Sequence, residues 1–98
     1  MIPSYVIKFS PLASRTIGDG LPEKVATAAL EFIFGPLADN PHRVGKQLHP
    51  PLFPAYSARR GEYRVIYRIF DEIVVVEIVS ISHRRDAYRP TPSPKGLE

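Results

Sequence analysis

The sequence predicts an α+β fold, in which an antiparallel β-sheet carries an N-terminal strand and a helical hairpin packed on one face. Residues 5–10 have the alternation of a strand, and residues 21–33 carry an apolar stripe with helical spacing. Residues 55–82 then form three segments rich in Val, Ile and Tyr, separated by turn residues. A chain of 98 residues suits one domain with one modest core, so these elements must share that core.

Two helices are predicted after the N-terminal strand. Ser10 and Pro11 are the residue types of an N-cap and a first helical position, which indicates a short helix to about residue 17. A second helix begins at residues 21–23 and is kinked or stopped by Gly35-Pro36, although Leu37 and Ala38 could add a further turn. Its apolar stripe consists of Leu21, Val25, Ala28, Ala29, Phe32 and Ile33. Residues 41–54, which contain four prolines, are predicted to be a loop or a poorly regular crossing segment, and not a helix.

Three strands are predicted in the second half of the chain. They span about residues 55–59, 62–70 and 73–82, with turns at Arg60-Gly61 and Asp71-Glu72. Two-residue turns would place Arg59 opposite Glu62 and Arg68 opposite Val75. The face predicted to meet the helices carries Tyr56, Ala58, Tyr63, Val65, Tyr67, Ile69, Val74, Val76 and Ile78. The other face carries Ser57, Arg59, Glu62, Arg64, Ile66, Arg68, Val75, Glu77, Val79 and Ile81, and its mixture of Arg and aliphatic residues suggests a site or a docking surface.

Composition excludes several functional classes. The chain has no Cys, which excludes disulfide frameworks, thiolate nucleophiles and Cys-ligated zinc. Its three His lack the spacing of a metal site, so neither a metal nor a cofactor is expected, and His42 and His49 are expected to be exposed and without a role. No stretch approaches the roughly 20 apolar residues of a membrane span, and the N-terminus lacks a signal-peptide pattern. A cytoplasmic protein is therefore expected.

Positive charge gathers in the second half of the chain. Residues 42–89 hold nine basic and five acidic residues, whereas residues 1–41 hold three basic and four acidic residues. Eight of those nine basic residues are Arg, which binds phosphate or carboxylate through two parallel hydrogen bonds. Either a site for an anionic group or a solvated, Arg-rich surface accounts for this excess.

Arg64 is the strongest single candidate for a functional residue. It projects from a central strand on the face without helices, where it could bind a phosphate with two hydrogen bonds. A salt bridge to Glu62 or Glu77 is the structural alternative. Arg68 lies diagonal to Glu77 in the predicted register, and for this residue an ion pair is the preferred interpretation.

A second candidate site follows the last strand. Residues 83–89 bring an imidazole, three guanidiniums and a phenol together in the sequence His-Arg-Arg-Asp-Ala-Tyr-Arg. His83 or Tyr88 could transfer a proton while Arg neutralises charge, which is what phosphodiester cleavage by a 2′-hydroxyl requires. The alternative is a basic strand end in which Asp86 pairs with an Arg and Tyr88 packs as a lid.

Four segments carry a resemblance to a known family. They are residues 21–24, residues 40–48, residues 56–69 and residues 82–89. Together they look like the RelE toxins of bacterial and archaeal toxin–antitoxin pairs, in the wider RelE/ParE superfamily. The combination of Gly-Glu-Tyr-Arg-Val-Ile-Tyr with His-Arg-Arg-x-x-Tyr-Arg is more specific than either half. Residues 1–89 are accordingly expected to form a RelE-like toxin domain, and residues 90–98, rich in Pro, are expected to be a disordered tail.

The resemblance implies an endoribonuclease that cleaves mRNA in the ribosomal A site and so inhibits translation. A ribose 2′-hydroxyl attacks the adjacent phosphate and leaves a 2′,3′-cyclic phosphate. The implied catalytic residues are Arg64 at the transition state, Arg84 near the leaving oxygen, Tyr88 as the C-terminal tyrosine and His83 in proton transfer. The basic residues expected to bind RNA are Arg43, Lys46, Arg59, Arg60, Arg85 and Arg89. The implied partners are the ribosome with its mRNA and an acidic antitoxin that wraps around the toxin. Toxin and antitoxin could also assemble as a heterotetramer that binds operator DNA.

One departure from the family pattern bears on the chemistry. The best-known RelE members place two lysines at strand positions that are Ala55 and Ser57 in this chain. Proton transfer would then pass to His83 or Tyr88, and Lys46 with Arg43 would partly restore the positive charge. A ParE-like inhibitor of DNA gyrase without nuclease activity is therefore the second hypothesis, and a binding module that only represses its operon with the antitoxin is the third.

Overall fold

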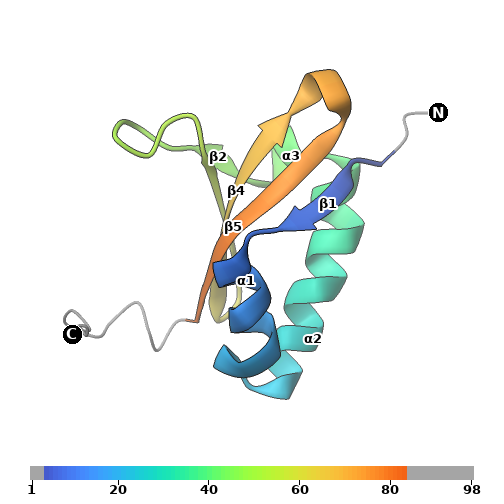
Figure 1. Cartoon of the computed structure of the whole chain (residues 1–98), viewed down its shortest axis with the longest axis vertical. Coiled ribbons are helices and arrows are strands. Elements are labelled where there is room, and N and C mark those ends of the chain that lie inside the picture. Colours follow the sequence, from blue (N-terminus) through green and yellow to red (C-terminus); the bar gives the residue numbers. More distant parts are fainter. Residues whose placement is uncertain (1–3, 84–98) are drawn as a thin grey trace.

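The structure, a computed structural model, describes residues 4–83 and has the predicted α+β fold (Figure 1). Its strands are β1 (Val6–Phe9), β2 (Lys46–Gln47), β3 (Tyr56–Arg60), β4 (Tyr63–Phe70) and β5 (Val75–His83). They form one sheet in the order β1-β5-β4-β3-β2. β1 runs parallel to β5 while the other neighbours are antiparallel, so the sheet is mixed and not purely antiparallel.

The helical half of the chain follows the predicted start signals. Its elements are α1 (Pro11–Arg15), a π-type turn η1 (Thr16–Gly20), α2 (Glu23–Phe32), a second π-type turn η2 (Ile33–Leu37) and α3 (Pro41–Val44). Ser10 is the N-cap of α1, since its side-chain oxygen accepts a hydrogen bond from the backbone N–H of Ala13 at 3.0 Å. Pro36 lies inside η2, where the helix changes its winding and continues.

The prediction that residues 41–54 contain no helix is wrong at the start of this segment. Pro41 is the first residue of α3, where a proline fits because its missing N–H would have no helical partner. Lys46 and Gln47 then pair with β3 as a short edge strand. Only residues 48–55 form an irregular connection.

The core lies between the helices and one face of the sheet, as predicted. Figure 1 shows α1 and α2 on the same side of the sheet. The helical part contributes Ala13, Leu21, Ala29, Phe32, Ile33 and Leu37, and the sheet contributes Ala58, Tyr63, Val65, Tyr67, Val76, Ile78 and Ile81. Burial of this apolar area is the main stabilising term, at roughly 25 cal/mol per Å². The opposite face, called the open face below, has no helix against it among residues 4–83.

The first hairpin turns one residue later than predicted. Gly61 and Glu62 form the turn, and Gly61 has a φ of +55°, which glycine adopts without strain. Arg59 therefore lies opposite Arg64 and not opposite Glu62. Because the pairing shifts by two residues, every side chain stays on its predicted face.

The second hairpin has a longer turn than predicted. A 3-10 turn η3 (Asp71–Ile73) is followed by Val74 with a left-handed φ of 55°. Val74 thus belongs to the turn and not to the core face of a strand. Arg68 consequently lies opposite Glu77, whereas a two-residue turn would have placed it opposite Val75.

One extra residue in β5 changes which side chains face the core. The register shifts between Ile66 and Tyr67 of β4, which leaves Val79 of β5 as a bulge. A bulge moves the following side chains to the other face of the sheet. Ile81, predicted on the open face, is therefore buried in the core, and His83 is buried on the same side.

Among residues 4–83, no helix has the length and apolar character needed to cross a membrane.

Candidate functional site

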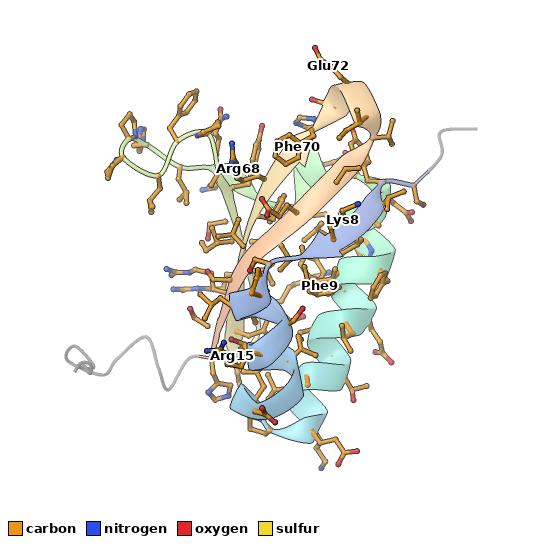
Figure 2. The ribbon with its side chains drawn as sticks, in the orientation of Figure 1. Lys8, Phe9, Arg15, Arg68, Phe70 and Glu72 are labelled. Atoms are coloured by element: carbon orange, nitrogen blue, oxygen red, sulfur yellow. The ribbon has the colours of Figure 1, made fainter. Side chains whose placement is uncertain are left out.

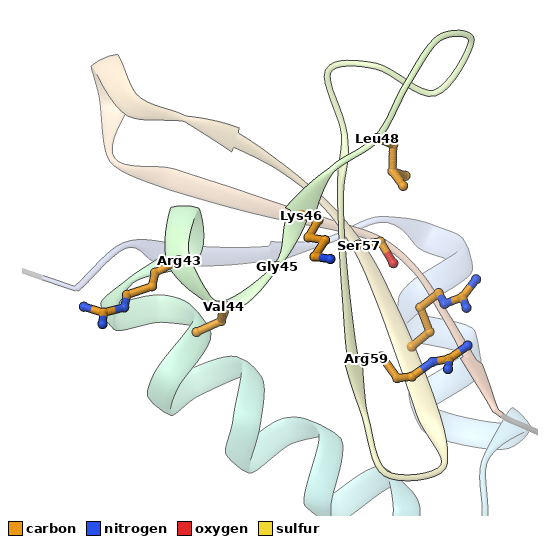
Figure 3. A pocket seen from close by; sticks show the side chains of 8 residues that line it. Arg43, Val44, Gly45, Lys46, Leu48, Ser57 and Arg59 are labelled. Carbon is orange, nitrogen blue, oxygen red and sulfur yellow. The ribbon is translucent and has the colours of Figure 1, made fainter.

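An open hollow with four basic side chains lies on the open face beside β2 (Figure 3). Its volume is about 620 Å³. It is lined by Arg43, Val44, Gly45, Lys46, Leu48, Ser57, Arg59 and Arg64. No acidic side chain is among them, so the hollow carries net positive charge and suits an anionic ligand.

Arg59 and Arg64 form the centre of positive charge. They are direct partners across β3 and β4, and both side chains are exposed on the open face. Like charges placed opposite each other on a sheet destabilise it unless an anion lies between them. The ion pairs within residues 4–83 are His42–Asp71 and His83–Glu62, so no carboxylate of the described part neutralises this arginine pair. The predicted alternative for Arg64, a salt bridge to Glu62 or Glu77, is therefore wrong.

Lys46 brings a third cation to the hollow because β2 pairs with β3. Lys46 lies directly opposite Ser57, one of the two positions where the resemblance leads one to expect lysine. Ala55, the other such position, is buried at 6% exposure and does not line the hollow. Through Lys46, β2 thus places one positive charge beside Ser57.

Gly45, the residue before β2, has no side chain, which allows β2 to pair with β3 at this position. A Cβ at residue 45 would collide with the hydroxyl oxygen of Tyr67 and would lie 2.8 Å from the carbonyl oxygen of Ser57. Tyr67 is fully buried, and its hydroxyl donates a hydrogen bond of 2.6 Å to the carbonyl oxygen of Pro41. Burial raises the pKa of the Tyr67 phenol, so the hydroxyl keeps this proton. Tyr67 thereby fixes the start of α3 and the path of the chain into Lys46.

Arg43 reaches only the edge of this site. It lines the hollow, yet Figure 3 shows its side chain projecting away from Lys46 and Arg59. Arg60 does not contribute to the hollow. It lies opposite Tyr63 at the end of β3, and its guanidinium stands 4.8 Å from the centre of the Phe32 ring on α2.

His83 lies on the other side of the sheet from Arg64. It pairs with Tyr63, is 8% exposed, and its Nε2 lies 3.2 Å from a carboxylate oxygen of Glu62. The structure therefore does not bring His83 together with the arginine pair. The remaining predicted site residues, Arg84, Arg85, Tyr88 and Arg89, lie outside the described residues.

The expected ion pair between Arg68 and Glu77 does not form within the described part of the chain. The two residues are direct partners in the sheet, but the Arg68 guanidinium instead stands 5.2 Å from the centre of the Phe70 ring. Figure 2 shows Arg68 and Phe70 beside each other. Arg68 is thus an exposed arginine of β4 that lies outside the hollow.

The prediction that His42 has no role is wrong, because His42 belongs to a polar cluster at the hairpin tip. Its Nε2 lies 2.8 Å from Oδ1 of Asp71, and its Nδ1 lies 3.2 Å from the Tyr56 hydroxyl. The Tyr5 hydroxyl also donates to Oδ1 of Asp71, at 2.6 Å. These hydrogen bonds, the one from Tyr5 first, hold the pKa of the Asp71 carboxyl below its usual value. His49 is exposed, as predicted.

The cluster holds α3 in place, since it ties His42 to the hairpin tip and to β3. Sequence reasoning missed it because the partners are 14, 29 and 66 residues apart. Within residues 4–83, no three His, Asp or Glu side chains gather in a way that could hold a metal ion.

The chain is similar to known toxins over nearly its whole length. The family model for the ParE toxin of the type II toxin–antitoxin system parDE matches residues 3–88. Toxin RelE of Mycobacterium tuberculosis is 48% identical over 88 residues, which is 90% of each chain. Toxin RelG of the same organism is 45% identical over 85 residues, covering 87% of this chain and 97% of the relative.

Solved structures agree with these sequence matches. The toxin–antitoxin complex RelBE2 of Mycobacterium tuberculosis matches with a TM-score of 0.82 and 42% identity, covering 88% of this chain and 98% of the matched chain. The isolated Escherichia coli RelE toxin matches with a TM-score of 0.67 and 22% identity over 82% of this chain and 84% of the other, which supports the fold alone. The chain therefore belongs to the ParE toxin family of type II toxin–antitoxin systems, within the RelE/ParE superfamily, as its sequence motifs indicate.

Proposed function

We propose that this toxin is an endoribonuclease that cleaves mRNA in the ribosomal A site and so inhibits translation. The observation that carries the proposal is the arginine pair of Arg59 and Arg64, with Lys46 beside it, in a hollow whose described lining residues include no acidic side chain. Three cations that have no carboxylate partner among residues 4–83 suit a phosphodiester backbone. The relatives named Toxin RelE and Toxin RelG, at 48% and 45% identity, favour the RelE-type activity over the other activities of the superfamily.

The proposed reaction needs no cofactor. The ribose 2′-oxygen forms a bond to the adjacent phosphorus as its proton leaves, and the bond from phosphorus to the 5′-oxygen breaks. The products are a 2′,3′-cyclic phosphate and a 5′-hydroxyl that takes up a proton. Negative charge grows on the non-bridging oxygens in the transition state, where the Arg64 guanidinium offers two hydrogen bonds. Arg59, its partner across the strands, would hold the same phosphate or the next one.

Proton transfer in this proposal falls to a residue beyond the described part of the chain. Among residues 4–83, no His, Tyr, Asp or Glu lines the hollow. Because His83 is buried on the other face and bound to Glu62, the proposal assigns proton transfer to Tyr88 and leaving-group stabilisation to Arg84. Arg85 and Arg89 would add RNA contacts. Lys46 would supply the charge that Ser57 lacks.

We also propose that a cognate acidic antitoxin covers the hollow and keeps the toxin inactive. The matched structure from Mycobacterium tuberculosis is itself a toxin–antitoxin complex. An acidic segment would neutralise the arginine pair in the absence of RNA. We further propose that toxin and antitoxin form a heterotetramer that binds operator DNA, and that the toxin acts in the cytoplasm.

The test uses two arginines of β4 that share the open face. Wild type, Arg64→Ala and Arg68→Ala are expressed in cells, and the 5′ ends of translated messages are mapped by primer extension. Cut ends are expected with wild type and with Arg68→Ala, because Arg68 lies outside the hollow. Arg64→Ala should reduce cutting by about 100-fold or more. Growth arrest with intact messages would refute the nuclease, and DNA breaks that require gyrase would support a ParE-like activity in its place.

A further inference from the structure

The connection between β2 and β3 exposes two large apolar side chains. Leu52 is 59% exposed and Phe53 is 55% exposed. Figure 1 shows this loop projecting away from the sheet. Its backbone is nevertheless tied together, because the N–H groups of Leu52 and Phe53 both donate to the carbonyl oxygen of His49, at 3.1 and 3.2 Å. The Phe53 ring is thus exposed to solvent on a hydrogen-bonded loop, and it does not contribute to the hydrophobic core.

The loop is continuous with the basic hollow. Leu48, its first residue, lines the hollow, and the Leu48 N–H donates to the carbonyl oxygen of Ala55 at 2.8 Å, which closes the base of the loop. β3 leads from Tyr56 to Arg59, a distance of about 10 Å at the usual rise per residue. No acidic residue occurs anywhere in residues 40–61. The loop therefore adjoins the basic hollow at Leu48 and carries an exposed aromatic ring five residues further along.

Single-stranded RNA matches both the basic hollow and the exposed ring. Proteins bind single strands with a positive groove along the backbone and aromatic rings against which bases stack. The carboxylates of an acidic peptide would match the charge of the hollow, but they would not by themselves provide a partner for the exposed ring. We propose that Phe53 is a stacking platform for a nucleobase of the RNA strand whose phosphates are bound by Arg59 and Arg64. This inference rests on the proposed function, in that the anion in the hollow is RNA.

A tryptophan reporter tests the stacking directly. The chain has no Trp, so Phe53→Trp introduces a single fluorophore at the loop. A short single-stranded oligoribonucleotide should quench its fluorescence on binding, because a base stacks on the indole. An abasic oligomer of the same length keeps the phosphates without the bases, and polyglutamate supplies charge alone, so neither should quench. The matched control is Phe34→Trp, since Phe34 is 56% exposed and lies on η2, away from the hollow; its fluorescence should not respond to RNA.

Measurements of RNA affinity test the same inference without the tryptophan reporter. Phe53→Ala should weaken binding of the same oligoribonucleotide by about 5- to 150-fold, because stacking contributes roughly 1–3 kcal/mol per base. The slope of log affinity against log salt should stay unchanged, because no phosphate contact is lost. Phe34→Ala should bind like wild type. Circular dichroism of both variants should match wild type, since both side chains are more than half exposed.

The outcomes separate this inference from the proposed function. Wild-type affinity in Phe53→Ala, or equal quenching of the Phe53→Trp variant by the abasic oligomer or by polyglutamate, would overturn the stacking role. If Arg64→Ala still weakened binding in that case, the RNA site in the hollow would stand. Base-dependent quenching without any cleavage of ribosome-bound message would keep the stacking platform and refute the nuclease.

Discussion

Replacement of Gly45 by Ala would push β2 off the sheet. The added Cβ would overlap the Tyr67 hydroxyl and would lie 2.8 Å from the carbonyl oxygen of Ser57. Neither neighbour can move away easily. Tyr67 is 0% exposed and bonded to the carbonyl oxygen of Pro41, and the carbonyl of Ser57 belongs to β3.

The cost has two sources. Overpacking of a filled site destabilises by about 1–3 kcal/mol. If Tyr67 is displaced, its hydrogen bond to Pro41 is lost as well, at about 1 kcal/mol. The free energy of unfolding should therefore fall by about 2–4 kcal/mol, a large part of the roughly 5–15 kcal/mol of an ordinary domain. Tm should fall by about 8 °C or more.

Urea and thermal unfolding measure this loss, and Gly18→Ala is the matched control. A Cβ at Gly18 would meet no atom within 4 Å, and Gly18 has no left-handed φ, so that variant should be at least as stable as wild type. RNA affinity provides a second readout, because displacement of β2 moves Lys46 away from Ser57. If Gly45→Ala unfolds within about 0.5 kcal/mol of wild type and binds RNA equally well, the reasoning about Tyr67 is wrong.

Three further predictions concern single side chains. Ser10→Ala removes the N-cap of α1 and the hydrogen bond to the Val79 carbonyl oxygen at 2.6 Å, and urea unfolding should show a loss of about 0.5–2 kcal/mol; an unchanged midpoint would count against the cap. Tyr5→Phe removes the main cause of the lowered pKa of Asp71, so an NMR titration should find that pKa closer to 3.8. Because the folded-state pKa of Asp71 is lowered, the stabilisation from Asp71 is present above about pH 4 and is lost as pH falls through the folded pKa. The free energy of unfolding of Tyr5→Phe should therefore depend less on pH below about pH 4 than that of wild type. Identical acid-unfolding curves for the two proteins would contradict this. Arg64→Ala should reduce the slope of log RNA affinity against log salt by about 0.7, whereas Arg68→Ala should leave it unchanged, and equal slopes in both variants would remove Arg64 from the phosphate site.

Much of the fold follows from sequence periodicity. The apolar faces of β3 and β4 were predicted correctly although the first turn was misplaced, because the register error was an even number of residues. The bulge in β5 was missed, but the sequence holds a sign of it. Glu77 is a polar residue at an odd position, whereas Ser80 and Ser82 are polar at even positions, so the alternation changes phase between them.

The candidate site was only partly predictable. Arg64 and Arg59 could be assigned to the open face from alternation alone. The positive charge of Lys46 was expected from the resemblance, but its position directly opposite Ser57 was not, because that position depends on a two-residue strand in a segment whose prolines favour a loop. The contacts of His42 depend on Asp71 at the hairpin tip, which also binds Tyr5 just before β1. These residues are far apart in the sequence, so local patterns do not predict their contacts.

The most direct test of the central claim is cleavage on purified translating ribosomes, with one message that carries an ordinary ribose at the cut site and another that carries a single 2′-deoxyribose there. The account predicts that wild type and Arg68→Ala cut the first message and leave a 2′,3′-cyclic phosphate, that Arg64→Ala fails to cut it, and that no variant cuts the second. Equal cutting of the deoxy message, or undiminished cutting by Arg64→Ala, would contradict it.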